Sequence, residues 1–141
     1  MKVSEKGIKL IKESEGFKPN AYMCPAGVWT IGYGSTNGVT QGMIVTERFA
    51  ETLLKNHLAK TETQITSLNL SINQNQFDAL ADFVYNLGFG AFKSSTLLKL
   101  IVAKSSPELI KAEFRKWNKG NGKVLPGLVT RREAEIRLYF S

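Results

Sequence analysis

The sequence predicts an α+β fold in a single domain of 141 residues, with a small β region near the N-terminus and a larger helical body. The first observation is the placing of glycine. Residues 16–45 hold six of the 12 glycines and also the alternating run from Val28 to Tyr33. The second is that apolar residues recur at helical spacing over most of the chain beyond residue 45. A chain of this length buries one hydrophobic core and leaves little room for a second domain.

The β region is expected to present two different faces. Strand alternation turns Trp29 and Ile31 to one side and Thr30 to the other. The dipeptide Asn37-Gly38 is typical of a tight hairpin turn. The sequence therefore predicts a small hairpin within residues 16–45, with its turn at Asn37-Gly38.

Helices are expected on both sides of the β region. Residues 4–14 favour a short helix with Ser4 as its cap, and Thr46 can cap a long helix that runs to about residue 66. The capping-box pattern from Thr130 to Glu133 predicts the start of the last helix. Further helices are expected over residues 73–87 with Gly88 as a stop, from Ser95 through Ile101, and from Ser106 to Trp117, before a loop at residues 119–123.

The net charge of +7 is unevenly placed along the chain. Residues 91–141 carry eleven Lys and Arg against four Asp and Glu, so this segment accounts for the whole excess. Such a surface favours a polyanionic partner, which is a nucleic acid, an acidic membrane surface or an anionic cell wall. Charge alone does not choose among these three.

The sequence shows no membrane span and no signal peptide. No apolar run approaches the roughly 18 residues that a span needs, and the N-terminal residues lack the apolar centre of a signal peptide. The chain is therefore expected to start in the cytoplasm of the producing cell and to need outside help for export. Cys24 is the only cysteine, which excludes an internal disulfide.

Metal and cofactor chemistry find no support in the sequence. His57 is the single histidine and lies mid-helix between lysines, which is typical of a solvated helix residue. The carboxylates do not cluster at ligand spacing, and no phosphate-binding loop is present, so we expect no metal and no cofactor. Glycoside hydrolysis remains open, because it needs only one or two well-placed acid or base groups.

Glu15 is the candidate acid, because it ends the first helix directly before the β region. A carboxyl at the junction of two lobes faces the expected cleft, and apolar neighbours such as Phe17 or Trp29 would keep it protonated, as a general acid requires. The alternative is a surface charge near a helix end. Spacing alone favours this alternative.

The motifs of the chain resemble those of the phage-type lysozymes (endolysins) of glycoside hydrolase family 24. The active-site pattern of that family is Glu, eight residues, Asp or Cys, five residues, Thr, and this sequence has Glu15, Cys24 and Thr30 at that spacing. The resemblance continues along nearly the whole chain in Gly16-Phe17, residues 29–34, Asn73 to Leu80, Asn86 to Gly88, Gly90 to Phe92, Ser95 to Leu98, Trp117, Gly127-Leu128 and Arg131 to Glu133.

The resemblance implies a lysozyme-like fold with a cleft between two lobes. One lobe contains the β region at about 15–45, a long helix at about 46–66 connects the lobes, and residues 68–141 with 1–14 form the helical lobe. The implied activity is hydrolysis of the β-1,4 bond between N-acetylmuramic acid and N-acetylglucosamine in peptidoglycan, which lyses bacterial cells. A monomer without cofactor is expected. It would be held in the cytoplasm until a holin or a secretion system gives access to the wall, and it would bind no nucleic acid.

The resemblance also implies catalytic roles. Glu15 resembles the general acid that protonates the leaving sugar oxygen, and Cys24 with Thr30 resembles the pair that orients the attacking water. Direct attack by that water would invert the anomeric configuration. Cys24 stands where Asp is commoner in the family, and the alternative for it is a small buried hydrophobe.

Further roles follow from the same resemblance. Arg131, in preference to Arg132, resembles the arginine that positions the catalytic Glu, and Tyr85 and Ser95 resemble sugar-contacting residues. The chain departs from the family at Ser35, where members often have a histidine that makes a structural salt bridge. This departure puts a stabilising contact in doubt more than the chemistry.

Three alternatives remain open. A lytic transglycosylase would also use one essential Glu, but it would form an anhydro sugar without a positioned water. A basic binding protein would act through residues 91–141, although the aromatic residues there fall mostly at core-like helical positions. A lysozyme fold that has lost activity is the third, and the intact Glu15 and Thr30 argue against it.

Overall fold

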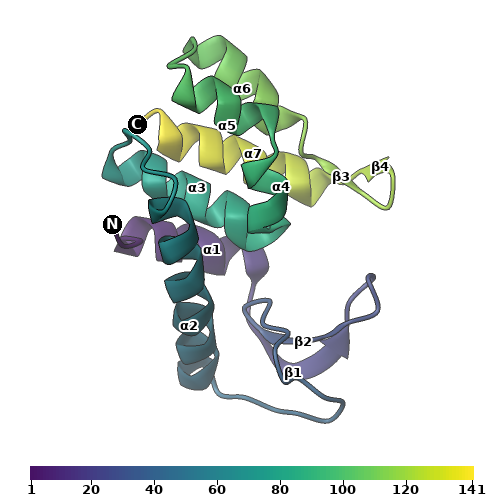
Figure 1. Cartoon of the computed structure of the whole chain (residues 1–141). Helices are drawn as coiled ribbons and strands as arrows, with labels where there is room; N and C mark the ends of the chain where they lie inside the picture. The colour runs from purple at the N-terminus through teal and green to yellow at the C-terminus, as the bar shows by residue number, and fades with distance from the viewer.

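The chain folds into seven helices and two small antiparallel sheets, which confirms the α+β class. The computed structural model describes all 141 residues. Figure 1 shows the first sheet below the helical body, joined to it by the long helix α2. The elements are α1 (Glu5–Glu15), β1 (Lys18–Met23), β2 (Trp29–Gly32), α2 (Glu47–Thr66), α3 (Gln74–Leu87), α4 (Phe89–Lys93), α5 (Thr96–Val102), α6 (Pro107–Arg115), β3 (Lys119–Gly120), β4 (Lys123–Val124) and α7 (Pro126–Tyr139).

The first sheet is a hairpin of β1 and β2, in which Tyr22 pairs with Thr30. Its turn lies at residues 24–28, where the amide of Gly27 donates to the carbonyl of Cys24 and Gly27 has a φ of +79°. The prediction that Asn37-Gly38 forms the hairpin turn was therefore wrong. That dipeptide does lie in a turn, but the chain after it returns along β1 without forming a named strand.

The long helix α2 begins and ends where the sequence predicts. Thr46 caps it, since its hydroxyl accepts a hydrogen bond from the amide of Phe49 at 3.1 Å. Strand β2 packs directly against this helix. A Cβ on Gly32 would lie 2.9 Å from the Cβ of Ala50, so only glycine permits this approach. The β lobe is thereby fixed to one end of α2.

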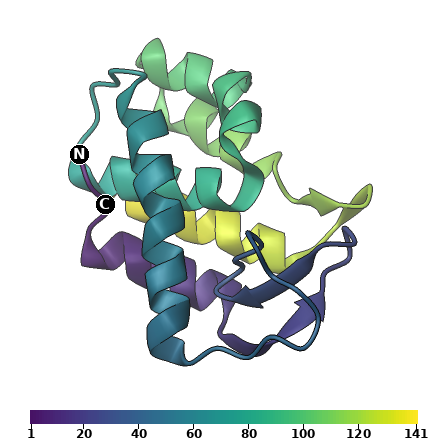
Figure 2. The ribbon, with the colours of Figure 1, turned by 60° about the horizontal axis from the view of Figure 1, so that its bottom comes forward.

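Helix α3 forms the centre of the helical body, with every residue from Phe77 to Tyr85 buried. Helices α1, α2 and α7 all pack against it, as the labels of Figure 1 and the same colours in Figure 2 show. Gly88 ends this helix as the sequence predicts, and a capping box of Asn73 and Gln76, which was not predicted, starts it. A helix buried on all sides carries charged groups only if they are paired, so the aspartates within α3 need partners.

Two expectations about helix starts were wrong. The hydroxyl of Ser4 does not cap α1, because it donates instead to the carboxylate of Asp78 in α3. Helix α7 begins at Pro126 and not at Thr130, which lies inside the helix. Proline suits the first helical turn because it has no amide hydrogen to leave unpaired. The last helix therefore starts one turn before the capping-box pattern.

Helix α6 ends at Arg115, two residues before the predicted end at Trp117. The expected loop at residues 119–123 is a tight hairpin of β3 and β4, whose turn residues Asn121 and Gly122 have φ values of +52° and +76°. No helix in the structure is both long and apolar enough to cross a bilayer.

Candidate active site

Glu15 lies at the C-terminal end of α1 and is held there by Arg131 of α7. Nη1 of Arg131 donates to Oε1 of Glu15 at 3.0 Å. The other side of the guanidinium binds Asp82 of α3, with Nε at 3.0 Å from Oδ2 and Nη2 at 2.9 Å from Oδ1. Burial lowers the pKa of Arg131, but its hydrogen bonds and charge interactions with Asp82 and then Glu15 outweigh this and raise it. The arginine is therefore a permanent cation.

The backbone after β2 closes in on the Glu15 carboxyl group. Gly34 has a φ of +80°, and a Cβ there would lie 2.7 Å from Oε2 of Glu15. Glycine at this position avoids a side-chain collision with Oε2. The Glu15 side chain is 18% exposed, so its carboxyl group is mostly buried yet still reaches solvent.

Cys24 and Thr30 lie together at the turn of the first hairpin. The Thr30 hydroxyl donates to the carbonyl of Val28 at 3.0 Å. The pKa of Cys24 is lowered, first by the backbone of Val28 and to a smaller extent by that of Ala26. The turn thus makes the thiolate form more accessible than in an ordinary thiol.

Tyr22 connects this pair to Glu15. Its pKa is raised, first by partial burial and then by the charges of Glu15 and of Cys24. Glu15 and Cys24 thus both lie close enough to Tyr22 to affect its phenol.

Tyr85 lies beside this neighbourhood but is buried. Its hydroxyl donates to the carbonyl of Tyr33 at 2.5 Å, and its ring packs against the exposed His57 with centroids 4.4 Å apart. Burial and then the charge of Glu15 raise the pKa of Tyr85, so the phenol stays neutral. Burial, followed by the charge of Lys60, lowers the pKa of His57. His57 is exposed, as expected for a solvated residue, but its ring also packs on that of Tyr85.

Ser95 does not join the other site residues. It is buried, its hydroxyl donates to the carbonyl of Phe92 at 2.6 Å, and it accepts from the amide of Leu98 at 3.0 Å. Both hydrogen-bonding functions are used at the start of α5, as its predicted role as a helix cap requires. This geometry gives no support to a sugar-contacting role for Ser95.

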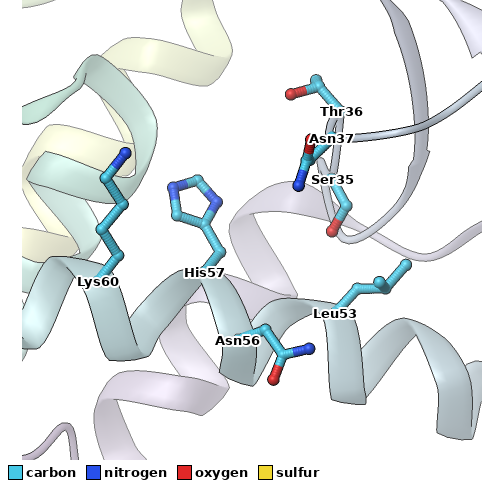
Figure 3. A pocket seen from close by; sticks show the side chains of 7 residues that line it. All are labelled: Ser35, Thr36, Asn37, Leu53, Asn56, His57 and Lys60. Carbon is cyan, nitrogen blue, oxygen red and sulfur yellow. The ribbon is translucent and has the colours of Figure 1, made fainter.

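A polar pocket of about 480 Å³ opens between the loop after β2 and α2. Figure 3 shows His57 and Lys60 rising from the helix beside the loop residues Ser35 to Asn37. Ser35 directly follows Gly34, the residue against Glu15, although Glu15 itself does not line the pocket. The chain has no histidine at position 35, and the Ser35 hydroxyl is buried without a hydrogen-bond partner.

A second buried contact, between Arg132 and Glu135, lies behind the first and was not predicted from the sequence. Arg132 donates to Glu135 at 2.9 Å and to Asn86 at 2.8 Å. Asp82 and Glu135 are both fully buried. Asp82 could have been found, because it stands among apolar residues in a helix predicted to be core, where a charge needs a partner.

The chain is similar over its full length to phage endolysins and to a muramidase domain. An endolysin of Acyrthosiphon pisum secondary endosymbiont phage 1 is 44% identical over 147 residues, which cover all of this chain and 99% of the relative. An endolysin of Bacillus phage PZA is 41% identical, and there the chain spans only 56% of the relative. Among solved structures, the muramidase domain of SpmX from Asticaccaulis excentricus has a TM-score of 0.91 at 34% identity, covering 99% of this chain and 98% of that one.

The phage P22 lysozyme has a TM-score of 0.83 at 34% identity and covers all of this chain and 99% of its own. The profile of the phage lysozyme family matches residues 12–135, which include Glu15, Cys24, Thr30 and Arg131. The chain therefore belongs to the phage lysozyme family.

Proposed function

We propose that this chain acts as an endolysin-type muramidase with Glu15 as its proton donor. Membership of the phage lysozyme family makes it a glycosidase that hydrolyses peptidoglycan. The bond cleaved would be the β-1,4 link between N-acetylmuramic acid and N-acetylglucosamine. The observation that carries the proposal is the Glu15 carboxyl group, held by Arg131 through Oε1 with Oε2 left beside Gly34.

In the proposed first event, Glu15 gives its proton to the leaving sugar oxygen. Arg131 orients the carboxyl group by binding Oε1, which leaves Oε2 to carry the proton. Orientation matters because a general acid must lie within hydrogen-bond reach of the oxygen that it protonates. The absence of a side chain at Gly34 gives a bulky sugar room to approach Oε2.

Water would attack from the opposite face of the sugar, guided by Cys24 and Thr30. The Thr30 hydroxyl gives its own proton to Val28, so its free lone pair can accept a hydrogen bond from the water. Because the pKa of Cys24 is lowered, its thiolate form is more accessible than that of an ordinary thiol, and in that form it would take the second proton of the water. Direct attack by a positioned water inverts the anomeric centre.

The pocket lined by Asn37, Asn56 and Lys60 would hold the glycan strand beyond the reacting sugars. Amide and ammonium groups are suitable donors for sugar hydroxyl and acetamido oxygens. We include Tyr85 in this part of the site only through His57, on which its ring packs. Its own hydroxyl is occupied by the carbonyl of Tyr33.

The wall would be reached only after release from the producing cell. Two relatives are described as SAR-endolysins, from Haemophilus phage HP1 and Escherichia phage P1. For this chain we propose that a holin or a secretion system opens the way. The positive charge of residues 91–141 would then draw the protein to the anionic wall.

The test is a zymogram on purified peptidoglycan with Glu15→Gln beside wild type. Glutamine keeps the shape but carries no transferable proton, so we expect a loss of about 100-fold or more. Glu13→Gln is the matched control, because Glu13 lies in the same helix with a side chain that is 64% exposed, and it should lyse as wild type does. Near-normal turnover by folded Glu15→Gln would refute the mechanism.

Mass spectrometry of the digest separates hydrolysis from transglycosylation. A hydrolase leaves reducing-end muramic acid, whereas a lytic transglycosylase leaves the 1,6-anhydro form. We expect the reducing end. Anhydro products from wild type would place the chain in the second class and leave the proposed water site without a function.

A further inference from the structure

Asp82 accepts two hydrogen bonds from the Arg131 guanidinium, and Glu15 accepts one. Arg131 directs two of its N–H groups, on Nε and Nη2, to the two oxygens of Asp82 and only Nη1 to Glu15. Asp82 is fully buried and Arg131 is 6% exposed, so water screens their charges weakly. Asp82, which is too buried for substrate to reach, therefore makes the bidentate contact with this arginine.

An unbalanced guanidinium at this place would oppose the proposed chemistry. A positive charge within about 4–6 Å favours the ionised form of a carboxyl group, whereas a general acid must keep its proton until the leaving oxygen takes it. Asp82 puts a negative charge on the far side of the same guanidinium. Glu15 thus faces an ion pair and not an isolated cation.

Glu135 completes the arrangement from the far side of Asp82. Burial, and then hydrogen bonding to Asp82, raise the pKa of Glu135 well above its ordinary range. Oε1 of Glu135 is buried with no aligned donor, although Nε of Arg132 lies 2.7 Å away. The raised pKa favours the protonated form of Glu135, whereas Asp82 is the carboxyl group that binds Arg131 through both oxygens.

The two phenols near Glu15 carry no charge that could replace that of Asp82. Tyr22 from β1 and Tyr85 from α3 both have raised pKa values, first through burial, so both are neutral. Cys24, whose pKa is lowered, lies in the turn after β1 and not on the arginine that contacts Glu15. Arg131 and Asp82 are therefore the buried charged groups whose balance Glu15 experiences directly.

We propose that Asp82 is a positioning residue of the muramidase reaction, which fixes Arg131 and offsets its charge so that Glu15 keeps its proton at the pH of catalysis. The inference rests on the proposed role of Glu15 as proton donor. It assigns to α3 a function besides packing, because the helix carries the counter-ion for the arginine that orients the acid.

The experiment removes the charge of Asp82 while preventing a compensating change next to it. In Asp82→Asn alone, Glu135 could release its proton and restore the negative charge. Asp82→Asn is therefore made in a Glu135→Gln background, and kcat and KM are measured against pH on soluble peptidoglycan fragments. Relative to Glu135→Gln alone, we expect the alkaline limb of the kcat profile to move down by about one pH unit, with KM little changed.

Two further variants test whether charge or packing is responsible. Asp82→Glu in the same background keeps the charge and should restore the alkaline limb. Asp78→Asn changes another fully buried aspartate of α3, which binds Ser4 and Gln74 and faces away from Glu15. This control should lower the melting temperature without moving the limb. If Asp82→Asn does not fold in this background, Asp82→Ser makes the same change of charge with a smaller side chain.

An unmoved limb in a folded Asp82→Asn or Asp82→Ser variant would overturn the inference. Its failure is distinguishable from failure of the proposed function. If Glu15→Gln is inactive while the limb stays in place, Glu15 is the acid and Asp82 only packs. If Glu15→Gln is active, the proton donor itself is misassigned and the inference falls with it.

Discussion

The phenol of Tyr85 donates a 2.5 Å hydrogen bond to the backbone carbonyl of Tyr33, joining the buried centre of the helical body to the β lobe. We expect Tyr85→Phe to destabilise the protein by about 1 kcal/mol or somewhat more, because it leaves a buried carbonyl group without its donor. The β lobe should also become less firmly placed against Glu15, and kcat should fall several-fold. Chemical denaturation and initial rates measure the two effects.

Tyr139→Phe is the matched control for that prediction. Tyr139 is also a buried tyrosine, but it packs among Phe114 and Phe140 at the far end of α7 and holds no part of the β lobe. Its substitution should leave kcat unchanged. An equal loss of activity in both variants would show that Tyr85 acts through general stability and not through its contact with the β lobe.

The positive charge of residues 91–141 should make lysis sensitive to salt. Lysis of whole cells should slow as ionic strength rises, because ions screen the attraction between exposed basic groups and the anionic wall. Cleavage of a short neutral chitooligosaccharide, if it serves as a substrate, should depend much less on salt. The same salt dependence for both substrates would exclude a steering role for this charge.

The stereochemistry of the product tests the water site formed by the hairpin turn. If Thr30 and Cys24 hold the attacking water, the newly formed reducing end should have the inverted, α configuration. Proton NMR of fresh product, recorded before mutarotation, measures it. Retention of the β configuration would require a covalent intermediate and would contradict the proposed role of the pair.

The helices were largely predictable from the sequence because their signals are local. Thr46, Asn73 and Ser106 each stand at a helix start, and each caps its helix through its own side chain. Glu15 could be placed at the end of α1 for the same reason, since Gly16 directly follows it and ends the helix. The signals that start and stop a helix lie within one turn of the residue concerned.

Contacts between distant segments were less accessible. The capping-box pattern at Thr130 was misleading, because Pro126 starts α7 earlier and Glu133 is instead paired with Arg115 of α6. The choice of Arg131 over Arg132 came from family resemblance, and its partner Asp82 lies 49 residues away in the sequence. Pairing over such a separation leaves no local trace, so a buried charge in a core helix was the only available sign of it.

Cys24 substitutions should separate water positioning from packing. Cys24→Asp should retain substantial activity, since a carboxylate can also accept a proton from water, whereas Cys24→Ala should lose much of it because the water loses a neighbour. The lowered pKa of Cys24 predicts that alkylation becomes fast at a lower pH than for an ordinary thiol. Alkylation should inhibit, and bound substrate should protect. Wild-type rates for Cys24→Ala, with no inhibition on alkylation, would reduce Cys24 to a packing residue.

Glu135 should make the stability of the protein fall with rising pH. Its folded-state pKa is raised, first by burial, so its contribution is fully present below the unfolded pKa of about 4.3 and is lost as pH rises toward the folded value. Between the unfolded and the folded pKa, the free energy of unfolding falls by about 1.4 kcal/mol for each pH unit, because only the folded state holds the proton. Glu135→Gln has no proton to lose, so its free energy of unfolding relative to wild type should improve as pH rises above about 4.3 toward the raised folded pKa.

Glu133→Gln, a substitution in the same helix, should change the pH dependence of stability in the opposite direction. A hydrogen bond from Arg115 lowers the pKa of Glu133, so its small contribution is present above the unfolded pKa and is lost as pH falls. The Glu133→Gln variant should therefore lose a little stability relative to wild type as pH rises, whereas Glu135→Gln gains. Urea unfolding of the three proteins between pH 4 and pH 7 measures both slopes. A pH-independent difference between Glu135→Gln and wild type would mean that Glu135 is ionised in the fold, paired with Arg132, and that Asp82 shares no proton with it.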